Sequence, residues 1–315
     1  MTLLVSVLDD YQHVAQDFAD WASLGNDARC TFVHEHLDEQ TLIRRAIDSD
    51  VLVCMRERRP LPRPVLERLP RLRLVVTTGP RNAAIDIDAA RELGVEVRGT
   101  ESLPSPTAEL TWALIHTITR RVEAEDRELR GGRWQTKIGT DLAGNTLGVV
   151  GLGRLGRRVA RVANAFEMPV LAWSPNLTPE RAHCAGVRHA SLDELMSTCD
   201  IVTVHLVLGP QTKGVIGAAE LARMKPSAWL VNTSRGPLVD QAALLDALRN
   251  RSIAGAALDV FDTEPLPAND PLLKLDNVIL SPHAGYVTHD SYALFYRQAV
   301  EDITAWRQGE ALRVL

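Results

Sequence analysis

Short apolar runs rich in β-branched residues alternate with segments of helical spacing along most of the chain. In the first hundred residues these runs predict four strands: Leu3–Leu8, Val51–Met55, Leu72–Thr78 and Val95–Val97. Helices are expected between them, at Tyr11–Trp21, Glu39–Ile47, Pro64–Leu69 and Ile87–Leu93. Such alternation is typical of a parallel sheet covered by helices.

The alternation changes after residue 100. Residues Pro106–Arg130 contain no glycine or further proline, so they predict one long helix that ends at Gly131. A second alternating series runs from Thr146–Val150 to Val278–Leu280, and Asp290–Trp306 has helical spacing again. We therefore expect an α/β protein with two parallel-sheet units, which agrees with a length of 315 residues and about 150 residues per domain.

The composition is that of a globular protein, with 45% hydrophobic and 24% charged residues. The net charge of −5 gives no global indication of a nucleic-acid partner. Of the 35 basic residues only four are lysine, which either reflects genomic codon bias or includes arginines placed to hold planar anions. The four cysteines are scattered without CxxC or metal-ligand spacing, so we expect reduced thiols and no metal site.

The amino terminus carries an apolar run that is too short for a signal peptide and has no basic residue before it. No stretch approaches the 18 consecutive apolar residues of a membrane-spanning helix. These observations predict a soluble cytoplasmic protein without a membrane partner.

A glycine-rich turn lies between the strand Thr146–Val150 and a helical run at Leu155–Phe166. Gly151 permits the tight turn, Gly153 lets a pyrophosphate approach the backbone, and Gly156 lets helix and strand pack closely. The residues Arg154 and Leu155 open the helix, whose amino end favours phosphate. The context indicates dinucleotide binding; a purely structural turn or a methyltransferase-type loop is the alternative.

The residue that usually contacts the adenine ribose is expected at the end of the next strand, where Ser174 stands in place of Asp or Glu. Serine accommodates either a hydroxyl or a phosphate. Enzymes that use NADP usually add a nearby arginine, and the nearest downstream candidate is Arg181. The cofactor is therefore predicted to be NAD or NADP.

Three later segments each follow a predicted strand: Asn-Thr-Ser-Arg-Gly with Arg235, Ala-Leu-Asp-Val-Phe-Asp-Thr-Glu-Pro with Glu264, and Ser-Pro-His-Ala-Gly with His283. Ligands of open α/β sheets bind at the carboxyl ends of the strands. Arginine, glutamate and histidine there suit hydride transfer to a 2-keto acid. The guanidinium binds the carboxylate, and the imidazolium, stabilised by a carboxylate, protonates the new alkoxide.

With these motifs and Gly-Leu-Gly-Arg-Leu-Gly in this order, the chain closely resembles the D-isomer-specific 2-hydroxyacid dehydrogenases over nearly its whole length. The resemblance implies that Arg235 clamps the substrate, His283 is the acid/base and Glu264 pairs with it. It also implies that Asp259 lies against the nicotinamide. Other cofactor contacts are implied for Thr107, His205 and Thr233.

The resemblance further implies a nested arrangement. Residues 1–100 and 285–315 would form a flavodoxin-like substrate domain, and residues 101–284 an inserted Rossmann domain that binds NAD(P). The active site would lie in the cleft, closure would exclude water, and a small anionic 2-keto or 2-hydroxy acid would be the substrate. The family also implies a homodimer, with the long helix as its arm and Trp134 packing across it.

The resemblance implies a substrate loop at residues 77–86, whose backbone amides would bind the substrate carboxylate, with Thr78 and Gly79 as substrate-binding residues. Gly79 and the closing Ile85-Asp86 fit the family pattern, but Arg81 replaces the usual second glycine, and Pro80 removes one backbone donor. Either the loop runs differently, or a guanidinium replaces amide donors. Arg56 follows the strand Val51–Met55 and could join Arg81 in holding an acidic group; the alternative is that Arg56 is a solvated rim residue.

The function predicted is an NAD(P)-dependent D-2-hydroxyacid dehydrogenase that acts as a 2-keto acid reductase. A dinucleotide-sensing binding protein or corepressor-like scaffold of the same fold is the alternative, because the family includes such proteins. A formate- or phosphite-type dehydrogenase is a third possibility, but the sequence contains no motif that is specific to it.

Overall fold

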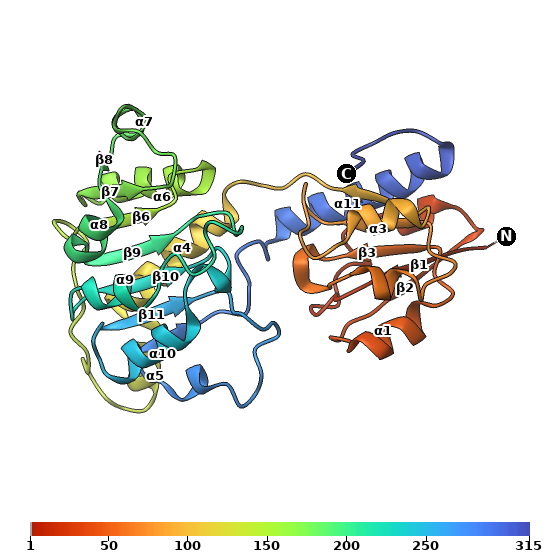
Figure 1. Ribbon diagram of the computed structural model, residues 1–315. Coiled ribbons are helices and arrows are strands. Elements are labelled where there is room, and N and C mark those ends of the chain that lie inside the picture. Colours follow the sequence, from red (N-terminus) through yellow and green to blue (C-terminus); the bar gives the residue numbers. More distant parts are fainter. Residues whose placement is uncertain (1) are drawn as a thin grey trace. The chain divides into compact units, whose positions relative to one another are not determined.

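The computed structural model describes residues 2–315 and divides them into two compact units (Figure 1). Unit 1 comprises the chain up to Leu103 together with Val287–Leu315, and unit 2 is Pro104–Tyr286. The red beginning and the deep-blue end of the chain therefore belong to the same unit (Figure 1). The predicted fold class of two parallel-sheet α/β units is confirmed.

Unit 1 is built on a five-stranded sheet in the order β2-β1-β3-β4-β5, the order of flavodoxin-like folds. All its pairs are parallel. The strands are β1 (Leu3–Val7), β2 (Ala28–Phe32), β3 (Val51–Cys54), β4 (Leu74–Thr77) and β5 (Glu96–Gly99). The helices are α1 (Glu39–Ala46), α2 (Arg63–Leu66), α3 (Ile87–Glu92) and α11 (His289–Gln308), with 3-10 turns at Trp21–Leu24 and Arg56–Arg58.

Unit 2 is built on a seven-stranded parallel sheet in the order β12-β11-β10-β9-β6-β7-β8. Its strands are β6 (Leu147–Val150), β7 (Val170–Trp173), β8 (Arg188–His189), β9 (Ile201–Val204), β10 (Trp229–Asn232), β11 (Gly255–Leu258) and β12 (Val278–Leu280). Its helices are α4 (Pro106–Arg120), α5 (Val122–Arg130), α6 (Arg154–Ala165), α7 (Pro179–Cys184), α8 (Leu192–Thr198), α9 (Ala218–Arg223) and α10 (Gln241–Arg249). Short 3-10 turns lie at Gly236–Leu238 and Pro271–Lys274.

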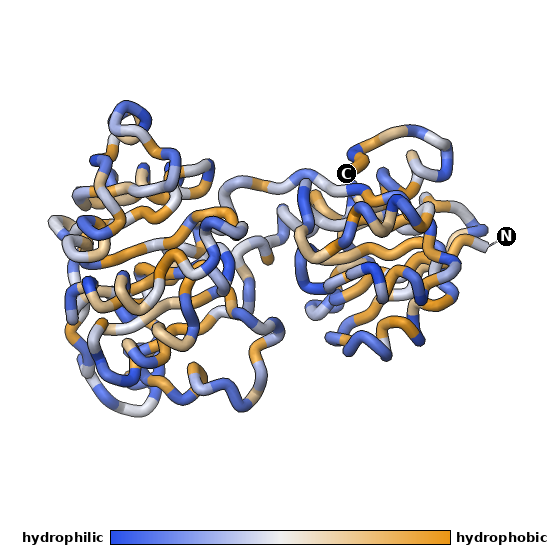
Figure 2. Tube along the Cα trace, viewed as in Figure 1, coloured by the Kyte–Doolittle hydropathy of each residue, from blue (hydrophilic) through white to orange (hydrophobic). Residues whose placement is uncertain are grey.

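Burial of both sheet faces explains why the central strands β3, β4, β6 and β9 are apolar along most of their length (Figure 2). In unit 2, one core lies between the sheet and the side chains of α4 and α6, such as Trp112 and Val159. A second core contains Leu195, Leu221 and Leu244 from α8, α9 and α10. Because the register is parallel throughout, all strands of this sheet end at one edge, where the loops that carry the candidate residues begin.

The last helix belongs to unit 1, which strand counting alone could not decide. Arg98 on β5 is only 2% exposed, and its guanidinium donates to the carbonyls of Asp302 and Glu310 at 2.9 and 2.6 Å. Arg313 forms an ion pair with Asp302 at 3.0 Å. These contacts attach α11 and the end of the chain to the sheet formed by its beginning.

The helix expected at Tyr11–Trp21 is wrong, because this segment folds as a series of turns before the 3-10 turn at Trp21–Leu24. Asp10 accepts hydrogen bonds from the amides of Val14 and Ala15, and the backbone of His13 is left-handed, with φ of 58°. A left-handed residue and a competing carboxylate both interrupt helical hydrogen bonding.

The single helix expected at Pro106–Arg130 is also wrong, since Arg121 is left-handed (φ 49°) and separates α4 from α5. The amide of Thr140, in the following loop, donates to the carbonyl of Thr119 at 2.8 Å. A continued helix would need that carbonyl for residue 123. The strand β2 was not expected, although Ala28–Phe32 has a half-buried, alternating pattern.

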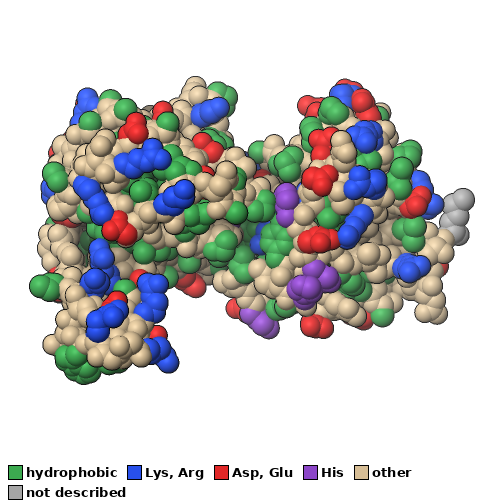
Figure 3. Space-filling model, turned by 90° about the horizontal axis from the view of Figure 1, so that it is seen from below, with side chains coloured by type: hydrophobic (Ala, Val, Ile, Leu, Met, Phe, Trp, Pro, Cys, Tyr) green, Lys and Arg blue, Asp and Glu red, His purple; other side chains and the backbone are tan. Residues whose placement is uncertain are grey.

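Charged residues are interspersed on the face that Figure 3 shows, with arginine, lysine, aspartate and glutamate side chains distributed over both units. The four cysteines are free thiols. Within residues 2–315 no helix has the length and apolarity needed to span a membrane.

Candidate active site

The glycine-rich turn has a packing reason for two of its three glycines. A Cβ on Gly151, whose φ is +110°, would collide with the backbone of His205 and Leu206. A Cβ on Gly156 would collide with the carbonyl oxygen of Gly151. Gly153 faces open space, so its lack of a side chain leaves the surface accessible to a ligand.

Beside this turn lies a cavity of about 220 Å³. The turn, the end of β7, helix α7 and the end of β9 all contribute to it: Gly151, Leu152, Gly153, Ser174, Pro175, Asn176, Leu177, Arg181, His205, Leu206 and Val207. Helix α6 begins at Arg154, which is exposed, and Leu155 is half-buried. The unpaired amides of the first turn point outward from this end of the helix, which is suited to phosphate.

The hydroxyl of Ser174 accepts a hydrogen bond from the amide of Leu152 at 2.8 Å. The serine therefore holds the glycine-rich turn against the end of β7. Arg181 donates to the carbonyl of Asn176 at 2.9 Å, which places its guanidinium on the wall of the cavity.

His205 is buried at the end of β9, and its Nε2 lies 3.0 Å from the hydroxyl of Thr203. Burial lowers the pKa of His205 to about 4, so the ring is neutral at pH 7. Its Nδ1 is buried and has no hydrogen-bond partner within residues 2–315. An unpaired buried ring nitrogen on a cavity wall fits a polar ligand in that cavity.

Two threonines of α4 connect the helix to the strand ends. The hydroxyls of Thr111 and Thr233 are 2.8 Å apart, and both residues are buried. Thr107 donates to the carbonyl of Gly285 at 3.1 Å. Helix α4 thus fixes the loops that follow β10 and β12.

Arg235 lies in a loop that is organised by its neighbours. The amide side chain of Asn232 bonds to the backbone of Ser234 and Arg235, at 3.0 and 2.9 Å. Ser234 donates to the carbonyl of Leu206 at 2.6 Å. The Arg235 guanidinium donates to the carbonyl of Ser234 at 2.6 Å. A Cβ on Gly236 would collide with the backbone of Phe261, so the loop is also closely packed.

The structure brings Glu264 and His283 together, with Oε2 of the glutamate 2.6 Å from Nδ1 of the histidine. The other carboxylate oxygen accepts the amide of Phe261 at 2.9 Å, which fixes its orientation. A carboxylate only accepts, so Nδ1 carries a proton and Nε2 is the nitrogen left for other partners. The side chains are 28% and 14% exposed, which leaves this pair accessible to a small molecule.

Asp259 is buried, and both of its oxygens are occupied by the loop that carries His283. Oδ1 accepts the Ser281 hydroxyl at 2.6 Å and the Ala284 amide at 2.7 Å, and Oδ2 accepts the Gly285 amide at 2.9 Å. Burial raises the pKa of Asp259, and the hydrogen bonds and His283 oppose that rise. In this structure Asp259 positions the loop; its contact with a nicotinamide stays a prediction.

In unit 1, Arg56 and the Thr78–Gly79 segment lie at the carboxyl ends of the adjacent strands β3 and β4. The amide of Arg56 donates to the hydroxyl of Thr78 at 2.9 Å. A Cβ on Gly79, which has φ of +98°, would overlap the Arg56 guanidinium. The amide of Gly79 donates to Thr100 at 2.7 Å, so this expected carboxylate donor is already engaged. Arg81 is exposed.

Sequence reasoning missed the polar residues that hold these loops. They are Asn82, Thr100, Thr111, Asn232 and Ser281. Asn232 and Ser281 stand inside the recognised motifs, so their short polar side chains directly after buried strands were a usable signal. The sequence contains no such signal for Thr100 and Thr111, because their hydrogen-bond partners are distant in sequence.

The arrangement in unit 2 places a dinucleotide-type turn, an arginine and a carboxylate–histidine pair at the carboxyl edge of one sheet. These are the parts needed to transfer a hydride from a nicotinamide and a proton to the same carbonyl group. The residues fit a dinucleotide, since Gly153 leaves its surface open and His205, which lines the adjoining cavity, has a buried ring nitrogen without a partner within residues 2–315.

Comparison with known proteins agrees with this geometry. The family model described as "D-isomer specific 2-hydroxyacid dehydrogenase, NAD binding domain" matches residues 112–285. A glyoxylate reductase of Korarchaeum cryptofilum is 39% identical over 279 residues, which are 86% of this chain and 84% of that protein. A D-3-phosphoglycerate dehydrogenase of Methanocaldococcus jannaschii is 37% identical over 278 residues, or 87% of this chain and 53% of that protein.

A solved structure of a phosphoglycerate oxidoreductase from Vibrio cholerae superposes with a TM-score of 0.92 at 34% identity. The match covers 98% of this chain and 100% of that one.

We expect Gly153→Ala to weaken cofactor binding without loss of stability, and Gly156→Ala to lower the stability of the protein. Gly153→Ala should leave the thermal unfolding midpoint within about 2 °C but weaken NAD(P)H binding at least about tenfold, because the methyl group occupies the path of the pyrophosphate. Gly156→Ala should lower the unfolding midpoint, because its methyl group meets backbone. Differential scanning fluorimetry and nicotinamide fluorescence titration measure both effects. Unchanged cofactor affinity in Gly153→Ala would contradict the assignment of this turn.

Proposed function

The chain belongs to the D-isomer-specific 2-hydroxyacid dehydrogenases, and we propose that it reduces small 2-keto acids to D-2-hydroxy acids with NAD(P)H. The observation that carries the proposal is the 2.6 Å contact between Glu264 and His283 on the same sheet edge as the glycine-rich turn. No finding supports the alternative of a non-catalytic dinucleotide sensor or scaffold.

We also propose a cytoplasmic location. The four free cysteines support it, and imaging of a fluorescent fusion would test it.

When bound, the reduced nicotinamide supplies a hydride to the carbonyl carbon. His283 gives a proton from Nε2 to the carbonyl oxygen as the C–O double bond becomes a single bond, so the 2-keto acid gains one hydride and one proton. Glu264 holds the ring through Nδ1 and stabilises the imidazolium before the transfer. In the reverse direction the neutral ring accepts the hydroxyl proton.

Arg235 is proposed to bind the substrate carboxylate and to polarise the carbonyl group, since a guanidinium offers two parallel donors to a planar anion. On unit 1, we propose substrate contacts for Arg56, Thr78, Gly79 and Arg81. Because the Gly79 amide is bound to Thr100, the Arg81 guanidinium is the better carboxylate donor of this loop.

A keto-acid panel tests the reaction. Glyoxylate, hydroxypyruvate and phenylpyruvate are mixed with NADH or NADPH, and cofactor oxidation is followed by absorbance. We expect turnover of at least one acid, and a kcat lower by at least about a hundredfold in His283→Asn with cofactor affinity within about twofold. His289→Asn is the matched control, because that histidine is 82% exposed on α11.

No cofactor oxidation with any acid would favour the non-catalytic alternative, whereas normal turnover in His283→Asn would remove His283 from the mechanism. In the same assay, Arg81→Ala should raise KM more than it lowers kcat. A kcat/KM within about twofold of wild type for every acid would exclude Arg81 from substrate binding.

For the cofactor, we propose a preference for NADPH over NADH. Ser174 presents no carboxylate to a 2′-phosphate, and no aspartate or glutamate is among the residues that line the adjoining cavity. Arg181 lies on its wall and supplies a positive charge. A 2′-phosphate beside an arginine gains a charge-assisted hydrogen bond, whereas a ribose hydroxyl gains little.

Arg181→Ala should therefore weaken NADPH binding about tenfold while NADH binding changes less than about twofold. Ser174→Asp should reverse the preference through repulsion of the phosphate. Arg161→Ala on α6 is the control, because Arg161 is exposed and does not line the cavity. An equal loss of affinity for NADPH and NADH in Arg181→Ala would show that the arginine does not bind the 2′-phosphate.

We also propose a homodimer through α5 and the loop that follows it. Large apolar side chains are exposed there: Val122 by 69%, Leu129 by 55%, Trp134 by 76% and Ile138 by 98%. Burying such a patch against a second copy would remove it from water.

The double variant Trp134→Glu/Ile138→Asp should convert a dimer into a monomer of about half the mass in size-exclusion chromatography with light scattering. Val314→Asp, at a 50% exposed position in unit 1, is the control and should remain dimeric. A wild-type monomer at micromolar concentration would contradict the proposal.

A further inference from the structure

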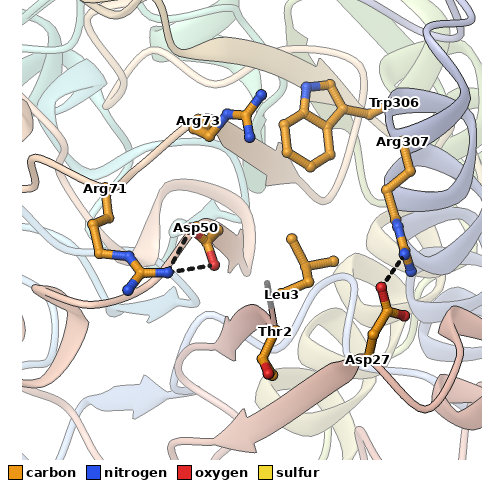
Figure 4. A pocket seen from close by; sticks show the side chains of 8 residues that line it. All are labelled: Thr2, Leu3, Asp27, Asp50, Arg71, Arg73, Trp306 and Arg307. Atoms are coloured by element: carbon orange, nitrogen blue, oxygen red, sulfur yellow. Dashed lines mark hydrogen bonds and ion pairs between the residues drawn. The ribbon is translucent and has the colours of Figure 1, made fainter.

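A second cavity, of about 290 Å³, lies at the amino edge of the unit 1 sheet (Figure 4). Residues just before or at the start of β1 to β4 line it, among them Leu3, Asp27, Asp50 and Arg73, and the end of α11 completes it. Arg56 and Thr78 follow the opposite ends of β3 and β4. A four-residue strand is about 13 Å long, so this cavity is separate from the proposed substrate loop.

Three arginines and two aspartates set the charge of the cavity. Arg307 is paired with Asp27 at 2.7 Å. Arg71 contacts both oxygens of Asp50, at 3.1 and 3.3 Å, but uses only Nη2 (Figure 4). Asp50 also accepts the Leu4 amide at 2.9 Å, so part of its hydrogen-bonding capacity serves the backbone.

Arg73 has no carboxylate partner within residues 2–315 and lies over the ring of Trp306, 5.2 Å from its centre. Its guanidinium therefore has a defined position without a neutralising anion. With three cations and two carboxylates, the lining carries one net positive charge. Asp50 does not use Nη1 and Nε of Arg71, which add donors to the lining of the cavity.

We infer that this cavity binds a small oxyanion, a carboxylate or a phosphate, at the Arg73 guanidinium beside Trp306, with Arg71 as a second cation of the lining. The planar fork of a guanidinium group matches the oxygen spacing of such anions. Leu3 and the indole of Trp306 form an apolar wall that accommodates a short hydrocarbon part. The site is distinct from the one proposed for catalysis and does not depend on its chemistry.

Isothermal titration calorimetry of the full-length protein tests this binding, with inorganic phosphate in one arm and succinate in the other. Saturating NADPH is present, so that phosphate does not bind at the glycine-rich turn. We expect saturable binding of at least one probe and a loss of at least about tenfold in affinity in Arg73→Gln. Glutamine keeps a polar side chain over Trp306 but removes the charge.

Arg91→Gln on α3 is the matched control, because it removes the same charge from unit 1 at a residue that is 68% exposed and outside the cavity. It should bind each probe within about twofold of wild type. Arg71→Gln serves as the second test if Arg73→Gln does not fold. Binding of phosphate alone identifies a phosphate ester as the ligand class, and binding of succinate alone a carboxylate.

Two results would overturn the inference. One is that wild-type protein shows no saturable binding of either probe up to about 20 mM. The other is that Arg73→Gln and Arg91→Gln bind like wild type. Neither result bears on 2-keto acid reduction, because binding is measured without turnover and the catalytic residues are unchanged.

Discussion

The buried carboxylate of Asp259 is the interaction on which the candidate active site depends. It stands at the end of β11 and accepts three hydrogen bonds from the loop that follows β12. That loop contains His283, whose backbone is left-handed with φ of 51°. Three donors and the nearby imidazole offset part of the cost of burying the charge, so the carboxylate can hold a strained loop in place. Glu264 then has only to orient a ring that is already positioned.

At the neighbouring strand ends, neutral side chains hold the loops in place. Asn232 closes the loop before Arg235, and the hydroxyls of Thr111 and Thr233 connect that strand end to α4. Short amides and hydroxyls satisfy backbone groups without adding a charge that would compete with the substrate. As a result Nε2 of His283 is not needed to hold the protein together, and it stays available for chemistry.

Local patterns in the sequence predicted the parallel sheets and the glycine-rich turn, and the family resemblance predicted the contact between Glu264 and His283. The sequence could not predict the break at Arg121, since the carbonyl of Thr119 is taken by Thr140 from a later loop. Nor could it show that the hydroxyl of Ser174 accepts the amide of Leu152, at the position expected to contact the adenine ribose of the cofactor. Contacts between residues far apart in sequence decide both features, and no local pattern records them.

The arginine excess acquires a third explanation from the structure. Arg59 is 4% exposed and pairs with Asp9 at 2.8 Å while donating to the carbonyl of Leu37. Arg98, which is 2% exposed, binds the carbonyls of Asp302 in α11 and of Glu310 after that helix. A lysine ammonium could not reach several acceptors in one plane, and its desolvation would be less well compensated. Codon bias can supply arginine to the surface, but at these two positions the geometry of the guanidinium holds distant segments of unit 1 together.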